Sequence, residues 1–384
     1  MGYINRPHTL WWRKALFQVH LWLGIIIGLY VIAISLSGSV LVFKQSLLND
    51  TPKLSESSVR GPATWGQLVD VALRANPGSR LANIDMRSTE RRVVPIGLAL
   101  DGTTVTVFVD SFTRNIVKQE DLKKKHWFVE SMLALHTTLL LGAGGAVAVG
   151  VGGVLLFVMA VIGLVLWWPG IRSWKRTLRI NWHSRWTGIT FDLHRTFGFW
   201  CFLLVFMWGI TGAYFIFPRP VHQAIKVLSP MPSLEQRPSD WRQGDAILPV
   251  DDFIGRAQRM YPLDKLAYVF MDVDRPHGEV QVYMSLRPSV PMEQLEDEVV
   301  FQPATGAILM NTSSVHWTAG ERLSLGLYSA HFGDFGGWLL RIAWALLGLV
   351  PVVLVITGYA MWWNRTLKKK WAKLTKREAV ATGP

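Results

Sequence analysis

Four apolar runs of membrane length, each with a histidine near its start, constrain this chain most. An offset of 174 positions relates these pairs: His20 and His194, Gly24 and Gly198, Ser37 and Thr211, Gly38 and Gly212. An offset of 195 positions relates another set: His136 and His331, Gly142 and Gly337, Gly163 and Gly358, Trp167 and Trp362. Self-similarity at a fixed offset is typical of an internal repeat. We therefore predict two copies of one arrangement, with one histidine for each apolar run.

The composition favours a membrane protein with sizeable soluble parts. Half of the 384 residues are hydrophobic and the mean hydropathy is +0.24, which is too apolar for an ordinary soluble domain. Each run reaches the roughly 20 residues that a bilayer core requires. The first run is too long for a signal-peptide core, so we expect an uncleaved anchor.

The net charge of +13 lies beside the apolar runs. Residues 44–127 carry 13 basic and 9 acidic side chains and residues 219–330 carry 10 and 14, so these two regions cancel. The remaining 17 basic and 4 acidic residues account for the whole excess. Their positions predict, by the positive-inside rule, that both termini and the 169–193 connection are cytoplasmic. Because the bases flank membrane runs, we expect contact with lipids and no nucleic-acid partner.

The predicted fold class is a membrane α-helical bundle of four transmembrane helices with a parallel internal repeat and two periplasmic α+β units. Helix-period and strand-period patterns in both large loops predict a helix followed by a hairpin. The expected segments are a basic arm (1–15), a first span (16–43), a first α+β unit (44–127), an interfacial helix (128–142), a second span (143–168), a cytoplasmic loop (169–193), a third span (194–217), a second α+β unit (218–316), an interfacial helix (317–337), a fourth span (338–363) and a basic tail (364–384).

This topology sorts the four histidines by depth. His20 and His194 begin outward runs near the inner face, whereas His136 and His331 begin inward runs near the outer face. The repeat lets each pair face across the bundle axis. Two facing imidazoles suit the axial positions of a b-type haem, because neutral imidazole is a good iron ligand. We therefore predict two haems b, one for each pair.

Neighbouring residues fit this hypothesis with open alternatives. Gly24 and Gly198 give room for a macrocycle, although glycines in spans also serve close helix packing. Arg195 and Arg341 are candidate propionate partners or simple interfacial anchors. A zinc or copper site needs three or four ligands together, which the split by depth disfavours.

Other histidines and the single cysteine have weaker signals. His126 and His316 form a third related pair, which we interpret as surface residues, with ligation and substrate contact as alternatives. The four remaining histidines, His8, His183, His222 and His277, have no repeat partner and are read as ordinary. Cys201 is expected to pack inside the third span, and the chain has no CxxC or CxxCH motif.

The arrangement resembles the PepSY-associated transmembrane-helix family, the iron-regulated inner-membrane proteins that include ferrisiderophore reductases. The motifs that carry the resemblance are His20-x3-Gly24 with Ser37-Gly38, Leu135-His136 with Gly142, Asp192-Leu-His194-Arg195 with Gly198, and Ala330-His331-Phe-Gly333. The resemblance implies a bacterial inner-membrane protein that reduces iron(III) held by a siderophore in the periplasm. It also implies that residues 65–117 and 249–309 are PepSY domains.

The sequence hypothesis is thus a di-haem conduit that reduces a ferric siderophore and releases Fe(II) for iron uptake. The chain has no GxGxxG after a strand and no Walker loop, so the electron donor is expected to be a quinol, a cytoplasmic reductant or a redox protein. One alternative is a non-enzymatic PepSY protein that binds or regulates a partner. Another is a carrier of ferric siderophore or haem, which four unbroken spans in parallel repeats would disfavour.

Overall fold

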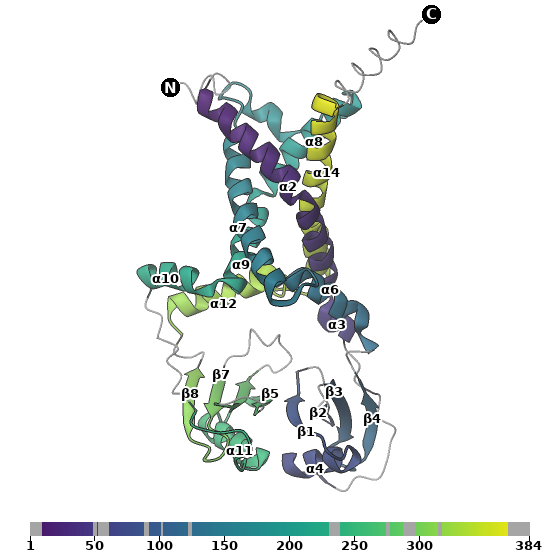
Figure 1. Cartoon of the computed structure of the whole chain (residues 1–384), viewed down its shortest axis with the longest axis vertical. Helices are drawn as coiled ribbons and strands as arrows, with labels where there is room; N and C mark the ends of the chain where they lie inside the picture. Colours follow the sequence, from purple (N-terminus) through teal and green to yellow (C-terminus); the bar gives the residue numbers. More distant parts are fainter. Residues whose placement is uncertain are drawn as a thin grey trace, which may run out of the picture. The chain divides into compact units, whose positions relative to one another are not determined.

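The computed structural model describes residues 10–48, 52, 61–87, 92–100, 103–121, 125–229, 239–273, 277–286, 297–313 and 317–367. The chain divides into two compact units (Figure 1). The helical unit comprises Met1–Lys44, Ser131–Gln223 and Leu327–Pro384, and the sheet unit comprises Gln45–Glu130 and Ala224–Gly326. Residues 1–9 of the predicted basic arm, most of the basic tail, His8, His316 and the turn at residues 101–102 lie outside the described residues, whereas residues 11–15 of the arm already belong to α2.

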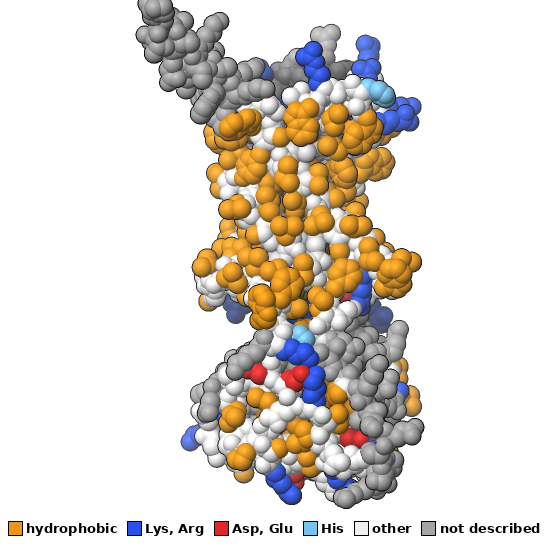
Figure 2. Space-filling model, turned by 90° about the vertical axis from the view of Figure 1, so that its right-hand side faces the viewer, with side chains coloured by type: hydrophobic (Ala, Val, Ile, Leu, Met, Phe, Trp, Pro, Cys, Tyr) orange, Lys and Arg blue, Asp and Glu red, His pale blue; other side chains and the backbone are white. Residues whose placement is uncertain are grey.

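Among the described residues, the helical unit contains three helical runs that are long and apolar enough to cross a membrane: α2 (Trp11–Leu41), α7 (Gly142–Trp167) and the run Trp338–Thr366, which includes α13 (Trp338–Gly348) and α14 (Val350–Trp362). A bent pair, α8 (Trp186–Trp200) and α9 (Phe202–Ile216), adds a fourth if it is counted as one span. Large apolar side chains such as Ile26 and Leu29 are mostly exposed. Figure 2 shows apolar side chains covering this unit on the face in view, as expected where lipid replaces water.

The third span differs from the prediction. It begins at Trp186, not at residue 194, and its two halves are bent by 65° at Cys201. The expectation of unbroken spans is therefore wrong at this position. The two halves differ in their main partner: α8 packs mostly against α14 and less against α7, whereas α9 packs against α7. The contact with α14 is thus made by the half before the bend.

Small residues explain the close packing of α7 on α9. A Cβ added at Gly153 would lie 2.7 Å from the backbone nitrogen of Ala213, and one added at Gly209 would lie 2.6 Å from that of Phe157. Neither position can hold a side chain without moving the other helix. This contact is the small-residue interface that membrane helices use where apolar burial gives no driving force.

Shorter helices flank the spans, and their bounds correct two predictions. The predicted interfacial helices 128–142 and 317–337 are α6 (Trp127–Thr138) and α12 (Ala319–Phe332), both shorter than expected. α6 ends early because Leu139 and Leu140 adopt positive φ angles of 50° and 62°, which turn the chain before α7. The sequence reading missed an amphipathic helix, α10 (Pro218–Leu228). The remaining short elements are α3 (Lys44–Leu48), a 3₁₀ helix η2 (Trp174–Leu178) and a π-helical turn η5 (Trp363–Leu367).

The sheet unit corrects the expectation of two separate α+β units. Its strands form one eight-stranded antiparallel sheet in the order β4-β3-β2-β1-β5-β6-β7-β8. The first half contains α4 (Trp65–Ala75), β1 (Arg80–Asp85), β2 (Val93–Leu100), β3 (Thr103–Asp110) and β4 (Ile116–Glu120). The second half contains α11 (Val250–Met260), β5 (Lys265–Asp272), β6 (Glu279–Ser285), β7 (Asp297–Phe301) and β8 (Ile308–Ser313). The halves join because β1 pairs with β5.

A shared core and one cap reinforce that join. Ile84 of β1 and Val269 of β5 are register partners and both are fully buried. Asp251 at the start of α11 accepts hydrogen bonds from the backbone amides of Trp65 and Gly66, each at 2.9 Å. A carboxylate at a helix start satisfies free amide groups and complements the helix dipole. The second half thus caps the helix of the first.

Candidate haem-ligand pairs

The four sequence-predicted histidines meet as two pairs within the helical unit. The ring centroids of His20 (α2) and His194 (α8) are 6.3 Å apart, with an interplanar angle of 87°. Those of His136 (α6) and His331 (α12) are 6.1 Å apart, with an angle of 66°. We call these the inner pair and the outer pair. The pairing follows the repeat, since each pair joins a residue of one copy to its counterpart in the other.

The two pairs are distinct sites. Ser37 on α2 contacts His136 of the outer pair, and 17 positions separate it from His20 of the inner pair on the same helix. At 1.5 Å per residue, this spacing is about 25 Å along α2. The four rings therefore cannot share one metal ion.

Hydroxyl groups fix the tautomer of both outer histidines. Ser37 donates its proton to the carbonyl of Ala33 at 2.7 Å, so its oxygen accepts from Nδ1 of His136 at 3.3 Å, which also reaches the carbonyl of Ile34 at 3.0 Å. An Nδ1–H donor leaves Nε2 with the lone pair. The Nε2 atom of His136 is therefore the nitrogen available to a metal.

The same arrangement recurs in the other copy. Thr211 donates to the carbonyl of Met207 at 2.8 Å and contacts Nδ1 of His331 at 2.7 Å. In the inner pair, Nδ1 of His194 contacts both the carbonyl of Leu354 at 2.9 Å and the hydroxyl of Thr357 at 3.0 Å. These three histidines thus present the same ring nitrogen away from their hydrogen-bond partners.

The spacing of each pair fits two axial ligands of one iron. A metal–imidazole bond of about 2 Å, with a ring centre about 1 Å beyond the nitrogen, gives a centroid separation of about 6 Å for two ligands on opposite sides. The observed values are 6.3 and 6.1 Å. Among the described residues, no three His, Cys, Asp or Glu side chains converge as a metal cluster. A group that supplies its own equatorial ligands, as haem does, is the kind that two imidazoles complete.

Glycines lie against the rings of the paired histidines, although these are not the two glycines that the sequence favoured. A Cβ at Gly163 would lie 3.3 Å from His20, and one at Gly358 would lie 3.5 Å from His194. At Gly38, a Cβ would come within 2.8 Å of His136. Gly24 and Gly198 instead face the side chains of Met159 and Leu354, respectively. They adjoin the ring-contacting residues, and their role in admitting a macrocycle stays a prediction.

Both candidate propionate partners have carboxylate partners of their own. Arg195 contacts Asp192 at 2.7 Å and lies over the ring of Phe191. Arg341 contacts Asp334 at 3.5 Å. Asp334, three residues after His331, thus pairs with Arg341 and does not accept from the His331 ring. The hydrogen-bond partner of that ring is Thr211. The propionate role of the two arginines stays a prediction, and in the protein as described each is already neutralised.

Aromatic side chains line one side of the outer pair, a feature that the sequence did not predict. The ring centroids of His331 and Phe215 are 5.0 Å apart, and Phe215 stacks on Tyr328 with a centroid distance of 4.6 Å. The corresponding residues of the other copy, 174 positions before Phe215 and 195 before Tyr328, are Leu41 and Leu133. The outer pair is thus flanked asymmetrically. The signal in the sequence was this replacement of leucine by an aromatic residue at related positions.

The remaining sequence candidates lie away from the pairs. His126 is half-buried at the start of α6, and the structure gives it no place in either pair. His222 bonds to the hydroxyl of Tyr214 at 2.9 Å, although no repeat relation pointed to it. Cys201 is buried at the bend of the third span.

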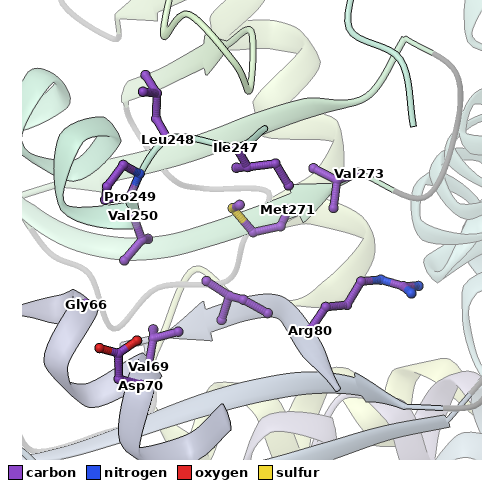
Figure 3. A pocket seen from close by; sticks show the side chains of 11 residues that line it. Gly66, Val69, Asp70, Arg80, Ile247, Leu248, Pro249, Val250, Met271 and Val273 are labelled. Atoms are coloured by element: carbon purple, nitrogen blue, oxygen red, sulfur yellow. The ribbon is translucent and has the colours of Figure 1, made fainter. Parts of the chain in front are cut away.

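The sheet unit contains a cleft of about 490 Å³ (Figure 3). Its first wall comes from α4 and β1 and includes Asp70 and Arg80. The second wall comes from the segment before α11 and from β5, and it is apolar, with Ile247 and Met271 among its side chains. A cleft of this size is within the range of small-molecule sites. The pairing of β1 with β5 ends at Asn83 and Phe270. The cleft lies beyond this point, between the ends of the two strands that no longer pair with each other.

Comparison with known proteins gives two findings. The family model described as the PepSY-associated TM region matches residues 17–365. An uncharacterized protein of Pseudomonas aeruginosa, PA4219, is 23% identical over 288 residues, which cover 66% of this chain and 68% of that protein.

Proposed function

The chain belongs to the PepSY-associated transmembrane family, and from that premise we propose that it is a di-haem b-type electron-transfer protein that reduces a ferric siderophore. The apolar helices support a membrane location. In the proposed orientation the protein lies in a bacterial inner membrane with cytoplasmic termini, and its sheet unit is periplasmic. The observation that carries the proposal is the pairing of four histidines at 6.3 and 6.1 Å.

In this proposal the chain's residues hold and orient rather than react. Bound haem supplies one-electron transfer. His20 and His194 hold the inner group, and His136 and His331 hold the outer group. Ser37, Thr211 and Thr357 hold Nδ1 of their histidines, so that Nε2 would be the nitrogen that holds the iron. The surrounding apolar spans exclude water, which protects the ligand set from competing water ligands.

The proposed substrate is iron(III) bound to a siderophore, which yields Fe(II) after gaining one electron. The donor is a quinol, a cytoplasmic reductant or a redox protein, because no nucleotide motif is visible in the sequence. The cleft between the two halves of the sheet unit is the place where we would first test chelate binding. Replacement of Arg80 by Ala there is expected to weaken binding of an anionic ferric chelate.

The test uses the outer pair, because its loss separates haem binding from substrate reduction. His136→Ala and His331→Ala are expected to keep the inner haem and to lose at least ten-fold in the rate at which the reduced protein reduces a ferric hydroxamate. Fe(II) is trapped with a chromogenic chelator under anaerobic conditions. His183→Ala, a change at an exposed histidine outside both pairs, is the control. Wild-type rates in both outer variants would contradict the proposal.

A carrier function is the second candidate, because the third span is bent by 65° at Cys201. Broken spans line substrate sites in many transporters. A carrier would take up ferric chelate into sealed vesicles without any reductant, whereas the proposed reductase would not. A non-enzymatic PepSY binding protein would instead be colourless after purification from haem-replete cells.

A further inference from the structure

The two inner ligands differ in their hydrogen bonding. Nδ1 of His194 bonds to the carbonyl of Leu354 and to the hydroxyl of Thr357. The residue 195 positions before Thr357 is Ile162, which has no hydroxyl and is 8% exposed. The backbone of Met159, at the position related to Leu354, interacts with His20. Nδ1 of His20 is buried, and no described residue, Met159 included, meets the distance and angle of a hydrogen bond to it.

The outer pair shows that this difference is confined to one position. Both outer histidines contact a hydroxyl at Nδ1, from Ser37 and from Thr211. In all three hydroxyl contacts the serine or threonine also donates to the carbonyl four residues earlier, at 2.7 to 2.8 Å. The hydroxyl proton is therefore engaged, and its oxygen is set to accept. His20 is the one predicted ligand that lacks this acceptor.

An acceptor at Nδ1–H changes the imidazole as a ligand. A hydrogen bond there raises the basicity of Nε2 and fixes the ring orientation. A more basic ligand stabilises the ferric form of an iron centre relative to the ferrous form, and so lowers its reduction potential. Removing the acceptor has the opposite effect.

We propose that the residues at positions 162 and 357 set the reduction potential of a haem held by His20 and His194. Thr357 makes His194 the stronger donor, and Ile162 leaves His20 the weaker one, so the inner site has a higher potential than a site with a hydroxyl at both positions. Both act through a ligand and are positioning residues. This inference deepens the proposed function and rests on it.

The test is a redox titration of variants that add or remove one hydroxyl. Ile162→Thr is expected to shift the midpoint potential of the inner haem to a more negative value. Thr357→Val, which removes the hydroxyl at nearly constant volume, is expected to shift it to a more positive value. Thr357→Ser keeps the hydroxyl and should match the wild type. All are measured in the His136→Ala background, so that the inner haem is titrated alone.

A second readout separates ligand tuning from a change in packing. The low-spin electron paramagnetic resonance signal of the oxidised protein depends on ligand basicity, and it should move in opposite directions in Ile162→Thr and Thr357→Val. Haem-loaded variants with unmoved midpoints would overturn the inference alone, as would shifts of the same sign in both. A colourless parent protein would overturn the proposed function, and this inference with it.

Discussion

The two copies meet differently in the two units. In the helical unit, related residues face one another, so that His20 meets His194 and His136 meets His331. In the sheet unit, the corresponding strands β1 and β5 lie side by side and pair through their backbones. Facing copies place two equivalent side chains opposite each other, whereas edge-to-edge copies create one continuous sheet. The same duplication thus yields paired histidines in one unit and an extended sheet in the other.

The copies have also diverged at the join between the sheet halves. Asp251 at the start of α11 caps α4, but the related position at the start of α4 is Gly66. A Cβ on Gly66 would lie 2.6 Å from the Asp251 carboxylate. Only the second copy therefore supplies a carboxylate across the join. The glycine at the related position of the first copy leaves room for it.

Loss of one ligand should have the largest effect in the helical unit. His20→Ala and His194→Ala are each expected to remove the inner haem completely, because one remaining imidazole cannot complete a six-coordinate site. The outer haem should remain. Haem content per chain, from a pyridine haemochrome assay, should fall from two to one. Full content in both variants would show that facing rings are not ligands.

Adding a methyl group beside one histidine ring of the outer pair should have the next largest effect on haem content. Gly38→Ala places a Cβ within 2.8 Å of His136, so the ring must move, and the outer haem content is expected to fall several-fold. The related Gly212 has no atom within 4 Å of an added Cβ. Gly212→Ala is therefore the matched control and should keep full content. Equal loss in both would indicate a general helix defect.

In the sheet unit the largest effect should come from Asp251, which bonds to the start of α4 from the other half. Asp251→Ala removes the acceptor of two amide bonds, and it is expected to cost about 1–2 kcal/mol of stability. Asp251→Asn keeps one acceptor and should cost less. Thermal unfolding of the full chain in detergent is followed through the spectroscopic signal of the β-sheet. An unchanged melting temperature in Asp251→Ala would show that β1–β5 pairing alone maintains the join.

A smaller effect should appear as the part of the pH dependence of stability that Asp110 contributes in the first half of the sheet unit. Burial by itself would raise the pKa of Asp110, but hydrogen bonds from Arg92 and from the amides of Phe112 and Thr113 outweigh it, so this pKa lies below its usual value. Asp110 therefore stabilises the folded state fully above its unfolded pKa of about 4, and this contribution is lost as pH falls through the lower folded pKa.

The second half provides the control for this pH effect. Gln302 accepts from the amide of Thr305 at 2.6 Å, as Asp110 accepts from Thr113 at 3.2 Å. An amide does not titrate in this range. Acid unfolding of Asp110→Asn should therefore lose part of the pH dependence below about pH 5, whereas Gln302→Ala should leave that dependence unchanged. Identical acid profiles for wild type and Asp110→Asn would contradict the assignment.

The repeated histidines were predictable because a repeat fixes which residues share a depth and an axis. The hairpin strand Glu279–Ser285 was also predictable, because alternation marks a half-buried strand and its burial does alternate. Val93–Leu100 was expected as a strand too, but its first six residues are all buried, so alternation does not describe it. The β1–β5 join was not predictable, since pairing between distant edges depends on the whole fold and leaves no local pattern. The bend at Cys201 was also hidden, because there is no proline at the break to mark it in the sequence.

The hydroxyl partners of the histidines were visible in the sequence but had no assigned role. Ser37 and Thr211 belong to the repeat, yet only the structure brings them to His136 and His331. The role of Thr357 was harder to predict, because its counterpart in the other copy is Ile162, so the two copies differ at this position. A repeat highlights what the copies share, and so it conceals the residues by which they differ.

The most direct measurement is an absorption spectrum of the detergent-purified protein, air-oxidised and then reduced with dithionite, with a pyridine haemochrome count. The account predicts two b-type haems per chain, both low-spin, with sharp α-bands on reduction. One haem per chain would contradict the two-site account. A protein without haem, purified from cells with ample haem, would contradict it entirely and would make the four histidines packing residues of the helical unit.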